Sequence, residues 1–281
     1  MNWAHLVRQA EGILADAGVP AGPDARLIAE EVSGRKLALV ADQEPTSAEH
    51  QHYDDLIFRR ATREPLQHVL GKMWFRYLEL VSRPGTFIVR PETEMVVQAG
   101  LDAIAYLRAP RVVDLCTGSG AIALSIATER PTSAVWAIEK SEDAFAVAQQ
   151  NNSAYGNRVT MIHGDALEAS SLLGDVLYEG PFDLVISNPP YVPLGHQLDA
   201  EAQADPAMAL WGGGEEGLDF PYAVIGVASE LLGEGGILVM EHASEQSLAL
   251  VSAAEHAGFH AHTGQDLTGR DRFLFATKKE K

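Results

Sequence analysis

The sequence predicts an α/β fold: a doubly wound, mostly parallel seven-stranded sheet preceded by a small N-terminal helical domain. From residue 111 onward, apolar runs of strand length alternate with longer amphipathic stretches, which is the pattern of strand–helix–strand units. One apolar run, residues 184–186, ends abruptly at Pro189 and Pro190, as a buried strand must. Residues 1–70 differ, because their apolar side chains recur at helical spacing.

Three helices are expected in residues 1–70. The first ends near Gly18, the second runs from Pro23 to Gly34, and the third spans residues 47–61. Their apolar faces are formed by Leu6, Ala10, Ile13, Leu14, Ala25, Ile28, Ala29, Val32, Tyr53, Leu56, Ile57 and Arg60. This region contains no motif that carries chemistry, so we expect it to dock a substrate; a stabilising cap is the alternative.

Residues 71–90 change character and are predicted to form a β-hairpin linker. Phe75, Tyr77 and Leu80 alternate with polar residues around Pro84-Gly85, a turn signal. The chain is therefore expected to consist of a helical domain at 1–70, the linker at 71–90 and a sheet domain at 91–281.

The sheet domain begins next to the charged stretch Arg90-Pro91-Glu92-Thr93-Glu94. Proline at the start of a helix and acids in its first turn favour a helix running to about residue 107. We expect Glu92 to face the site, because this charge lies beside the sheet.

The strands expected next are residues 112–115, 134–138, 159–162, the run before Asn188, 237–240, and an antiparallel pair at 259–262 and 272–276. The expected helices between them are residues 120–129, 141–152, 218–232 and 246–257.

Residues 188–191, Asn-Pro-Pro-Tyr, are held at the carboxyl end of a strand, where open parallel sheets bind their ligands. The Asn188 side chain and the Pro189 carbonyl can accept both hydrogens of a planar NH2 group, while the Tyr191 ring stacks on its π-system. At average residue usage the tetrapeptide would arise by chance in on the order of one in a thousand chains of this length. It therefore indicates an enzyme that alkylates a conjugated amine or amide, provided that a methyl-donor site lies nearby.

Acids and glycines follow the three preceding strands. Two glycines in residues 114–120 let a ligand approach the backbone, and the helix beyond offers free N–H groups; NAD-binding folds use a similar turn. Glu139 ends the second strand, where an acid can bind both ribose hydroxyls. Asp165 ends the third, where a carboxylate can accept from an adenine amino group. Since parallel strands end at one sheet edge, these groups and Asn188 should line one site.

Together, the glycine turn, Glu139, Asp165 and Asn-Pro-Pro-Tyr resemble a class I S-adenosylmethionine-dependent methyltransferase, which has a Rossmann-like fold. The wider set of motifs resembles the protein-(glutamine-N5) methyltransferases that modify peptide-chain release factors, the HemK/PrmC family. The resemblance covers nearly the whole chain from about residue 24 onward, and it rests on residues 64–71, 90–94, 114–120, 188–191, 205–219 and 266–272. The pair of Arg-Pro-Glu-Thr-Glu and Asn-Pro-Pro-Tyr is its most specific part.

The resemblance implies that the methyl acceptor is the side-chain amide N5 of the glutamine in the Gly-Gly-Gln loop of a release factor. It implies catalytic roles for Asn188, Pro189 and Tyr191, and a substrate site to which Pro190 and Glu92 also contribute. It implies that S-adenosylmethionine is held by Cys116, Thr117, Gly118, Ser119, Gly120, Glu139, Asp165, Ala166 and Asn188.

Two stretches depart from the family pattern. His242-Ala243 replaces the usual Ile-Gly pair after the acid of the fifth strand, and Pro221-Tyr222 stands where an arginine usually follows Gly-Leu-Asp. Both lie outside the donor and acceptor motifs, so they bear on partner choice more than on chemistry. Three alternatives stay open: glutamine methylation of a ribosomal protein, nucleic-acid adenine N6-methylation by the same Asn-Pro-Pro-Tyr device, and a non-enzymatic scaffold.

Composition narrows these alternatives. With 39 acidic and 21 basic residues the net charge is −18, so the surface would repel a polyanion and we expect no direct nucleic-acid contact. A partner with a basic face fits better, although acidity also aids solubility.

No stretch reaches the roughly 18 apolar residues of a membrane span. The single Cys116 excludes an internal disulfide and, without a His-Glu-x-x-His pattern, a zinc site. We expect a cytoplasmic monomer that binds neither metal nor membrane.

The long segment at residues 193–217 contains the glycine run 212–214. A connection of this length in a compact domain is commonly functional, so we expect a lid or a loop that contacts the substrate.

Overall fold

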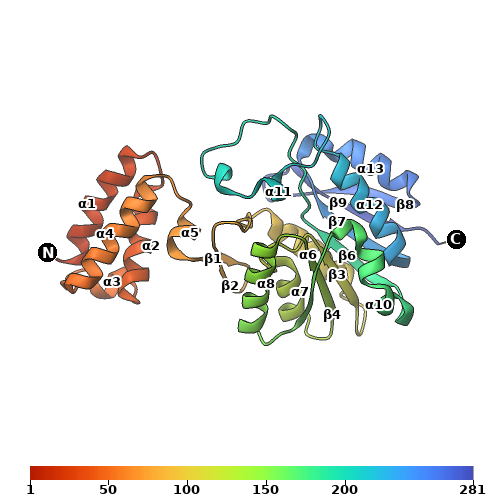
Figure 1. Ribbon diagram of the computed structural model, residues 1–281, viewed down its shortest axis with the longest axis horizontal. Helices are drawn as coiled ribbons and strands as arrows, with labels where there is room; N and C mark the ends of the chain where they lie inside the picture. The colour runs from red at the N-terminus through yellow and green to blue at the C-terminus, as the bar shows by residue number, and fades with distance from the viewer. Residues whose placement is uncertain (281) are drawn as a thin grey trace. The chain divides into compact units, whose positions relative to one another are not determined.

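A computed structural model describes residues 1–280 and divides the chain into two compact units (Figure 1). The first unit comprises Met1–Met73, Ser82–Pro84 and Leu198–Ala204. The second comprises Trp74–Val81, Gly85–Gln197 and the chain from Asp205 onward. The three-part division expected from the sequence stays a prediction.

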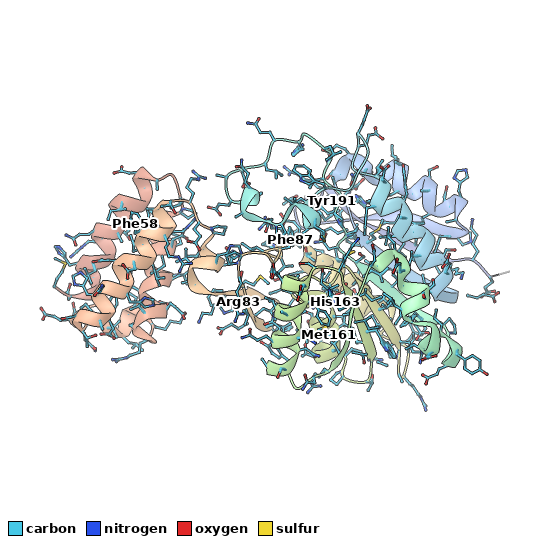
Figure 2. The ribbon with its side chains drawn as sticks, in the orientation of Figure 1. Phe58, Arg83, Phe87, Met161, His163 and Tyr191 are labelled. Atoms are coloured by element: carbon cyan, nitrogen blue, oxygen red, sulfur yellow. The ribbon has the colours of Figure 1, made fainter. Side chains whose placement is uncertain are left out.

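The first unit is helical, as expected. It contains α1 (Trp3–Asp16), α2 (Ala21–Ser33), α3 (Leu37–Val40), α4 (Ser47–Ala61) and α5 (Leu66–Leu70). Capping residues set the helix ends: Asn2 accepts from His5 N, Thr46 and Glu49 form a capping box, and Gly34 ends α2 in the left-handed conformation at φ +63°. The short helices α3 and α5 were not expected from the sequence. The apolar faces meet in one core, but Ile13 of α1, which was expected on such a face, is 52% exposed. Phe58 of α4 also lies outside the core, 72% exposed (Figure 2).

A buried arginine ties a distant segment into this unit. Arg60 is 2% exposed, and its Nε donates to Asp24 Oδ2 at 2.7 Å. Its Nη1 donates to the Glu64 carbonyl at 2.9 Å, and its Nη2 donates to Glu201 Oε1 at 2.7 Å. Each of the three guanidinium nitrogens therefore has a hydrogen-bond acceptor, as a buried charge requires. Glu201 lies in the segment Leu198–Ala204, which explains why that segment belongs to the helical unit.

The expected β-hairpin is present, but its turn lies elsewhere. Strands β1 (Lys72–Phe75) and β2 (Leu78–Val81) form a two-stranded sheet that turns at Arg76-Tyr77, and not at Pro84-Gly85. Arg76 takes the left-handed conformation at φ +50°. Its backbone N–H donates to Glu94, and its guanidinium donates to both Glu129 carboxylate oxygens at 2.6 and 2.7 Å. These tertiary contacts hold the turn, and they are not visible in a local sequence pattern.

The second unit confirms the doubly wound sheet. Its strand order is β5-β4-β3-β6-β7-β9-β8, parallel throughout except for β9, which runs antiparallel to β7 and β8. The strands are β3 (Arg111–Leu115), β4 (Ala134–Glu139), β5 (Val159–His163), β6 (Phe182–Ser187), β7 (Leu232–Glu241), β8 (Phe259–Gln265) and β9 (Asp271–Lys278). The chain moves from β3 outward to β5 and then returns to the other side of β3, so a topological switch point lies between β3 and β6.

Helices cover both faces of the sheet (Figure 1). One face carries α6 (Thr93–Ala103), α7 (Ala121–Glu129) and α8 (Glu142–Ala154), and the other carries α9 (Ala169–Leu172), α10 (Gly174–Glu179), α12 (Asp219–Leu231) and α13 (Ser247–His256). Strand β6 shows the alternation: Val185 packs on the α12 and α13 side, whereas Leu184 and Ile186 lie against Gly100 of α6. The remaining elements are η1 (Ala166–Glu168), η2 (Ala202–Ala204), α11 (Ala207–Leu210) and η3 (Ser244–Gln246). Among the described residues, no helix combines the length and apolarity that crossing a membrane requires.

Candidate active site

The turn after β3 combines glycines with a buried acid. Gly118 and Gly120 have φ of +58° and +85°, and Cys116 shares this left-handed conformation at φ +62° although it carries a side chain. Asp114 Oδ2 accepts from Thr117 Oγ1 at 2.5 Å and from Ala123 N at 3.2 Å, which joins the turn to the first turn of α7. Burial raises the pKa of Asp114 to about 7. Its Oδ1 has no hydrogen-bond partner within residues 1–280.

Glu139, at the end of β4, is fixed by backbone N–H groups. Its Oε2 accepts from Gly118 N at 2.8 Å and its Oε1 accepts from Ser141 N at 2.7 Å. Glu139 is 8% exposed, so burial raises its pKa while these N–H groups oppose the rise. The carboxylate thus joins the turn after β3 to the turn after β4.

Asp165, after β5, is held from two sides. Its Oδ1 accepts from Leu167 N at 3.0 Å, and its Oδ2 accepts from Lys140 Nζ at 2.7 Å. Burial raises the pKa of Asp165, but the Lys140 ammonium and the Leu167 N–H outweigh it, so the pKa lies below its ordinary value. The acids after β4 and β5 therefore lie at the same sheet edge, as the sequence predicted.

The turn after β6 is the acceptor turn, residues 188–191. Ser187 Oγ donates to the Leu115 carbonyl at 2.6 Å, which ties the end of β6 to the end of β3. Asn188 Nδ2 donates to Thr93 Oγ1 at 3.3 Å, at the start of α6. No hydrogen bond reaches Asn188 Oδ1 from any described residue, so this oxygen is the end of the amide that can accept from a ligand.

Tyr191 is fixed at both its hydroxyl and its carbonyl. Its Oη donates to Glu241 Oε1 at 3.0 Å, and its carbonyl accepts from Gln246 Nε2 at 2.8 Å. Burial raises the pKa of Tyr191 well above its usual value, and the neighbouring Glu241 carboxyl adds to the rise. Glu241 is 1% exposed, and burial likewise raises its pKa, while the nearby Thr93 hydroxyl and the hydrogen bond donated by Tyr191 oppose the rise.

Two glycines allow a second segment to pack against the acceptor turn. A Cβ at Gly217 would lie 2.3 Å from the Tyr191 carbonyl oxygen, and one at Gly212 would lie 2.8 Å from Tyr191 Cα. Gly212 N donates to the Val192 carbonyl at 3.0 Å. The glycine-containing segment is therefore hydrogen-bonded to the acceptor turn at this point, and only residues without a side chain fit.

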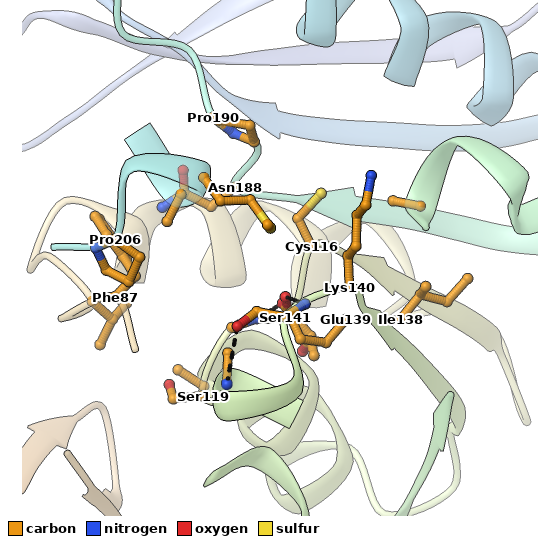
Figure 3. A pocket seen from close by; sticks show the side chains of 18 of the residues that line it. Phe87, Cys116, Ser119, Ile138, Glu139, Lys140, Ser141, Asn188, Pro190 and Pro206 are labelled. Atoms are coloured by element: carbon orange, nitrogen blue, oxygen red, sulfur yellow. Dashed lines mark hydrogen bonds between the residues drawn. The ribbon is translucent and has the colours of Figure 1, made fainter. Parts of the chain in front are cut away.

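One cavity of about 290 Å³ opens at this sheet edge, close to the lower end of the roughly 300–1,000 Å³ that small-molecule sites occupy. Figure 3 shows Asn188 and Pro190 on one side of it and Glu139, Ser141 and Ser119 on the other. Of the residues expected to form the site, those lining the cavity are Cys116, Thr117, Gly118, Ser119, Glu139, Asp165, Ala166, Asn188 and Pro190. Gly120, Pro189, Tyr191 and Glu92 do not line it, although each is adjacent in sequence to a residue that does.

Several residues at the site were missed by reasoning from the sequence. Apolar side chains form much of the cavity wall: Phe87, Val89, Ile122, Ile138, Met208, Trp211 and Phe220. Thr93, which also lines the cavity, and Glu241 and Gln246, which do not, hold the acceptor turn by hydrogen bonds. Glu241 had a detectable signal, because it is a further acid at the end of a parallel strand. Thr93 had none beyond its place in the family-like stretch 90–94, and Gln246 had none.

Comparisons with known proteins identify methyltransferases throughout. Residues 5–71 match the PrmC N-terminal domain family, and residues 79–205 match the Methyltransferase small domain family. A release factor glutamine methyltransferase of Bifidobacterium longum is 42% identical, over 98% of this chain and 99% of that protein. A 4-amino-L-phenylalanine/4-methylamino-L-phenylalanine methyltransferase of Streptomyces pristinaespiralis is 34% identical, over 98% of this chain and 94% of that protein.

A solved structure supports the fold independently. The T. thermophilus 16S rRNA N2 G1207 methyltransferase, in complex with AdoMet and guanosine, aligns over 74% of this chain and 50% of that chain. The TM-score is 0.52 at 21% identity, which is a likeness of fold.

Proposed function

The chain belongs to the HemK/PrmC family of release factor glutamine methyltransferases, and on this premise we propose that it methylates the side-chain amide N5 of the glutamine in the Gly-Gly-Gln loop of a peptide-chain release factor, with S-adenosylmethionine as donor. One observation supports this most: the glycine turn after β3 and Asn188 after β6 line the same cavity. Because β3 and β6 are neighbours in the sheet, their ends lie about 4.8 Å apart, which suits transfer between a donor and an acceptor held at the two ends.

The donor side of the cavity fits an adenosyl cofactor. A Cβ at Gly118 would meet no atom within 4 Å, so a ligand can approach the backbone closely there. Glu139 Oε2 accepts from Gly118 N and Oε1 accepts from Ser141 N, and a carboxylate oxygen that accepts one N–H keeps a lone pair for a ribose hydroxyl. The residues that would hold the cofactor are Cys116, Thr117, Gly118, Ser119, Gly120, Glu139, Asp165 and Ala166. When bound, its sulfonium supplies an electrophilic methyl group.

The acceptor side positions and polarises the substrate amide. Asn188 Oδ1 and the Pro189 carbonyl accept from its NH2 group, while Pro190 and Tyr191 border it. Holding the nitrogen in line at about 3–3.5 Å contributes several kcal/mol to lowering the barrier. The two accepting oxygens also stabilise the positive charge that develops on the nitrogen in the transition state. No base is needed before transfer, because the methylated amide cation is acidic enough to lose its proton to water.

We also propose that the chain acts as a cytoplasmic monomer. All residues that line the cavity lie within the second unit, so a single copy of the chain carries both the proposed donor side and the proposed acceptor side. The net charge of −18 favours a protein partner with a basic face over a nucleic acid.

A labelled methyl-transfer assay tests the proposed function. The purified chain is given methyl-labelled S-adenosylmethionine and one of five substrates: a release factor, the same factor with its Gly-Gly-Gln glutamine replaced by alanine, ribosomal protein, DNA, or 4-amino-L-phenylalanine. We expect label on the intact factor only, located on that glutamine by mass spectrometry. Equal label on the glutamine-replaced factor, or label confined to another substrate, would contradict the proposal and identify the true acceptor class.

A further inference from the structure

We propose that Asn151 of α8 is a positioning residue for the cofactor: its buried side chain fixes the turn after β3 and joins that turn to the hairpin strand β2. The inference rests on the proposed function, because the turn after β3 is the proposed binding site for S-adenosylmethionine. Asn151 does not line the cavity, so it acts through the backbone of the turn.

The Ser119 carbonyl requires a hydrogen-bond donor from outside its own helix. Ser119 directly precedes Gly120, the N-cap of α7, and the hydrogen bonds of α7 begin with Leu124 N, which donates to the Gly120 carbonyl at 2.9 Å. Among residues 1–280, no backbone N–H donates to the Ser119 carbonyl. Ser119 is 3% exposed, so this carbonyl needs a side-chain donor.

Asn151 supplies that donor. Its Nδ2 donates to the Ser119 carbonyl at 2.9 Å, and its Oδ1 accepts from Val81 N of β2 at 2.8 Å. A carbonyl can only accept and an N–H can only donate, so these two partners allow one orientation of the amide. Asn151 is 1% exposed, and reversing its amide would leave both backbone groups unpaired without water to replace the lost bonds.

The bond to Ser119 completes the pairing of the turn. The peptide group between Ser119 and Gly120 is held at both ends, because Gly120 N also donates to the Thr117 carbonyl at 2.9 Å. The peptide group between Thr117 and Gly118 is held likewise, since Gly118 N donates to Glu139 Oε2 at 2.8 Å. Between these two groups, the Gly118 carbonyl and the Ser119 N–H form no hydrogen bond with any described residue, so this peptide group is free to meet a ligand.

Loss of the Asn151 amide should therefore disturb cofactor binding in particular. The buried Ser119 carbonyl could regain a partner only if its peptide group rotated or α7 shifted, and either change moves the free peptide group between Gly118 and Ser119. Both of these residues line the cavity. The Asn151 side chain bonds only Ser119 and Val81 among the described residues, so the acceptor turn should be unaffected.

Asn152, the next residue of α8, provides a matched control. Its Nδ2 donates to the Val159 carbonyl at 2.8 Å, and its Oδ1 accepts from Val159 N at 3.1 Å. It is 6% exposed, so the two asparagines share their helix, their burial and the pairing of both amide ends with backbone groups. Val159 begins β5, at the end of the strand opposite to Asp165 and the cavity.

The test replaces each asparagine by leucine, which has a similar shape but cannot form hydrogen bonds. Three quantities are measured: KM for S-adenosylmethionine and kcat with the release factor, the Kd of S-adenosylhomocysteine by calorimetry, and the Tm. For Asn151→Leu we expect KM and Kd to rise about 10-fold or more, with kcat at saturating cofactor within about 3-fold of the unsubstituted chain. Asn152→Leu should lower the Tm as well, but it should leave KM and Kd within about 3-fold.

Val81→Pro tests the link to the hairpin. Proline removes the N–H that Asn151 Oδ1 accepts and leaves Asn151 itself in place. We expect this variant to bind S-adenosylhomocysteine about 3-fold or more weakly. Adding Val81→Pro to Asn151→Leu should weaken binding by no more than about 2-fold further, because both changes break the same set of contacts. Effects that multiply would show that β2 and the turn act independently, which would overturn the link.

Two other results would overturn the inference. One is a Kd for Asn151→Leu within about 3-fold of the unsubstituted chain; Asn151→Ala and Asn152→Ala give the same comparison if a leucine variant does not fold. The other is an equal rise in Kd for Asn152→Leu, since a loosened α8 would then be the cause. If the unsubstituted chain binds no S-adenosylhomocysteine, the proposed cofactor itself fails, which is a distinct result.

Discussion

After β4 and β5, backbone N–H groups donate to the carboxylates of Glu139 and Asp165, and Lys140 also binds Asp165. After β6, by contrast, the Asn188 amide and the Tyr191 hydroxyl are each held by another side chain. On the donor half, Glu139 bonds Gly118 N and Ser141 N, and Asp165 bonds Leu167 N. On the acceptor half, Asn188 bonds Thr93, and Tyr191 bonds Glu241.

This difference indicates how one sheet edge can bind both a cofactor and a substrate amide. The backbone can bind a cofactor of fixed shape, because glycines let it approach the cofactor closely. A planar NH2 group must instead meet hydrogen-bond acceptors, and buried side chains fix which atoms of the site accept. We therefore expect donor substitutions to change cofactor affinity and acceptor substitutions to change turnover.

The largest effect should come from Asn188→Ala. It removes one preorganised acceptor of the substrate NH2 group, so kcat should fall about 10²-fold or more. Cofactor affinity, measured by calorimetry, should change little, because the donor half is held by its own backbone contacts. Near-normal turnover of this variant on its release factor would remove Asn188 from the mechanism.

Two glycine-to-alanine substitutions, one on the acceptor half and one on the donor half, should differ in their effects on stability and on cofactor binding. At Gly217 a Cβ would lie 2.3 Å from the Tyr191 carbonyl oxygen and φ is +70°, so Gly217→Ala should lower the free energy of unfolding by about 2–4 kcal/mol and lower kcat. At Gly118 the φ of +58° also strains an alanine, but no atom lies within 4 Å of a Cβ, so Gly118→Ala should lower the free energy of unfolding by less than Gly217→Ala does and should also weaken cofactor binding. Thermal unfolding and cofactor calorimetry measure both, and a reversal of the two outcomes would break the comparison.

Glu139→Gln should act on the donor half alone. The amide keeps one acceptor for Gly118 N or Ser141 N but places an NH2 group against the other. We expect cofactor affinity to fall about 10-fold, with kcat at saturating cofactor within about 3-fold of the unsubstituted chain. Should kcat fall as far as in Asn188→Ala, Glu139 would have a role beyond binding.

A last expected effect is a dependence of stability on pH. The pKa of Asp114 is raised from 3.8 to about 7 in the folded chain, so the folded state holds this proton more tightly than the unfolded state. Its stabilising contribution is complete below pH 3.8 and is lost as the pH rises through about 7, with a slope of at most about 1.4 kcal/mol per pH unit. Asp114→Asn should therefore gain thermal stability relative to the unsubstituted chain as the pH rises from 5 to 8. Parallel melting curves for the two proteins would contradict this assignment.

Strand ends were the most predictable feature. The Asn188 turn, Glu139 and Asp165 could be placed on one edge because parallel strands end together, and the structure brings them to one cavity. The third helix was predicted with the same bounds as α4, because its apolar spacing is regular and Thr46 caps it. These features follow from local pattern together with sheet topology.

Contacts between residues far apart in the chain could not be predicted. The hairpin turns at Arg76 because Glu94 and Glu129 bind it there, and no sequence pattern near residue 76 indicates these two contacts. Likewise, Thr93 meets Asn188 only after the sheet and α6 have packed. The sequence therefore indicates which groups reach the edge, but the partners that orient them depend on tertiary packing.

The pairing of Glu201 with Arg60 has a consequence for anyone who wishes to divide this protein. A fragment that begins at Trp74 would keep Leu198–Ala204 but lose the guanidinium that Glu201 binds. A fragment that ends at Met73 would leave a buried cation with one carboxylate partner fewer. Grafting the helical unit of a relative onto this catalytic unit would consequently require exchanging two separate stretches of the gene together.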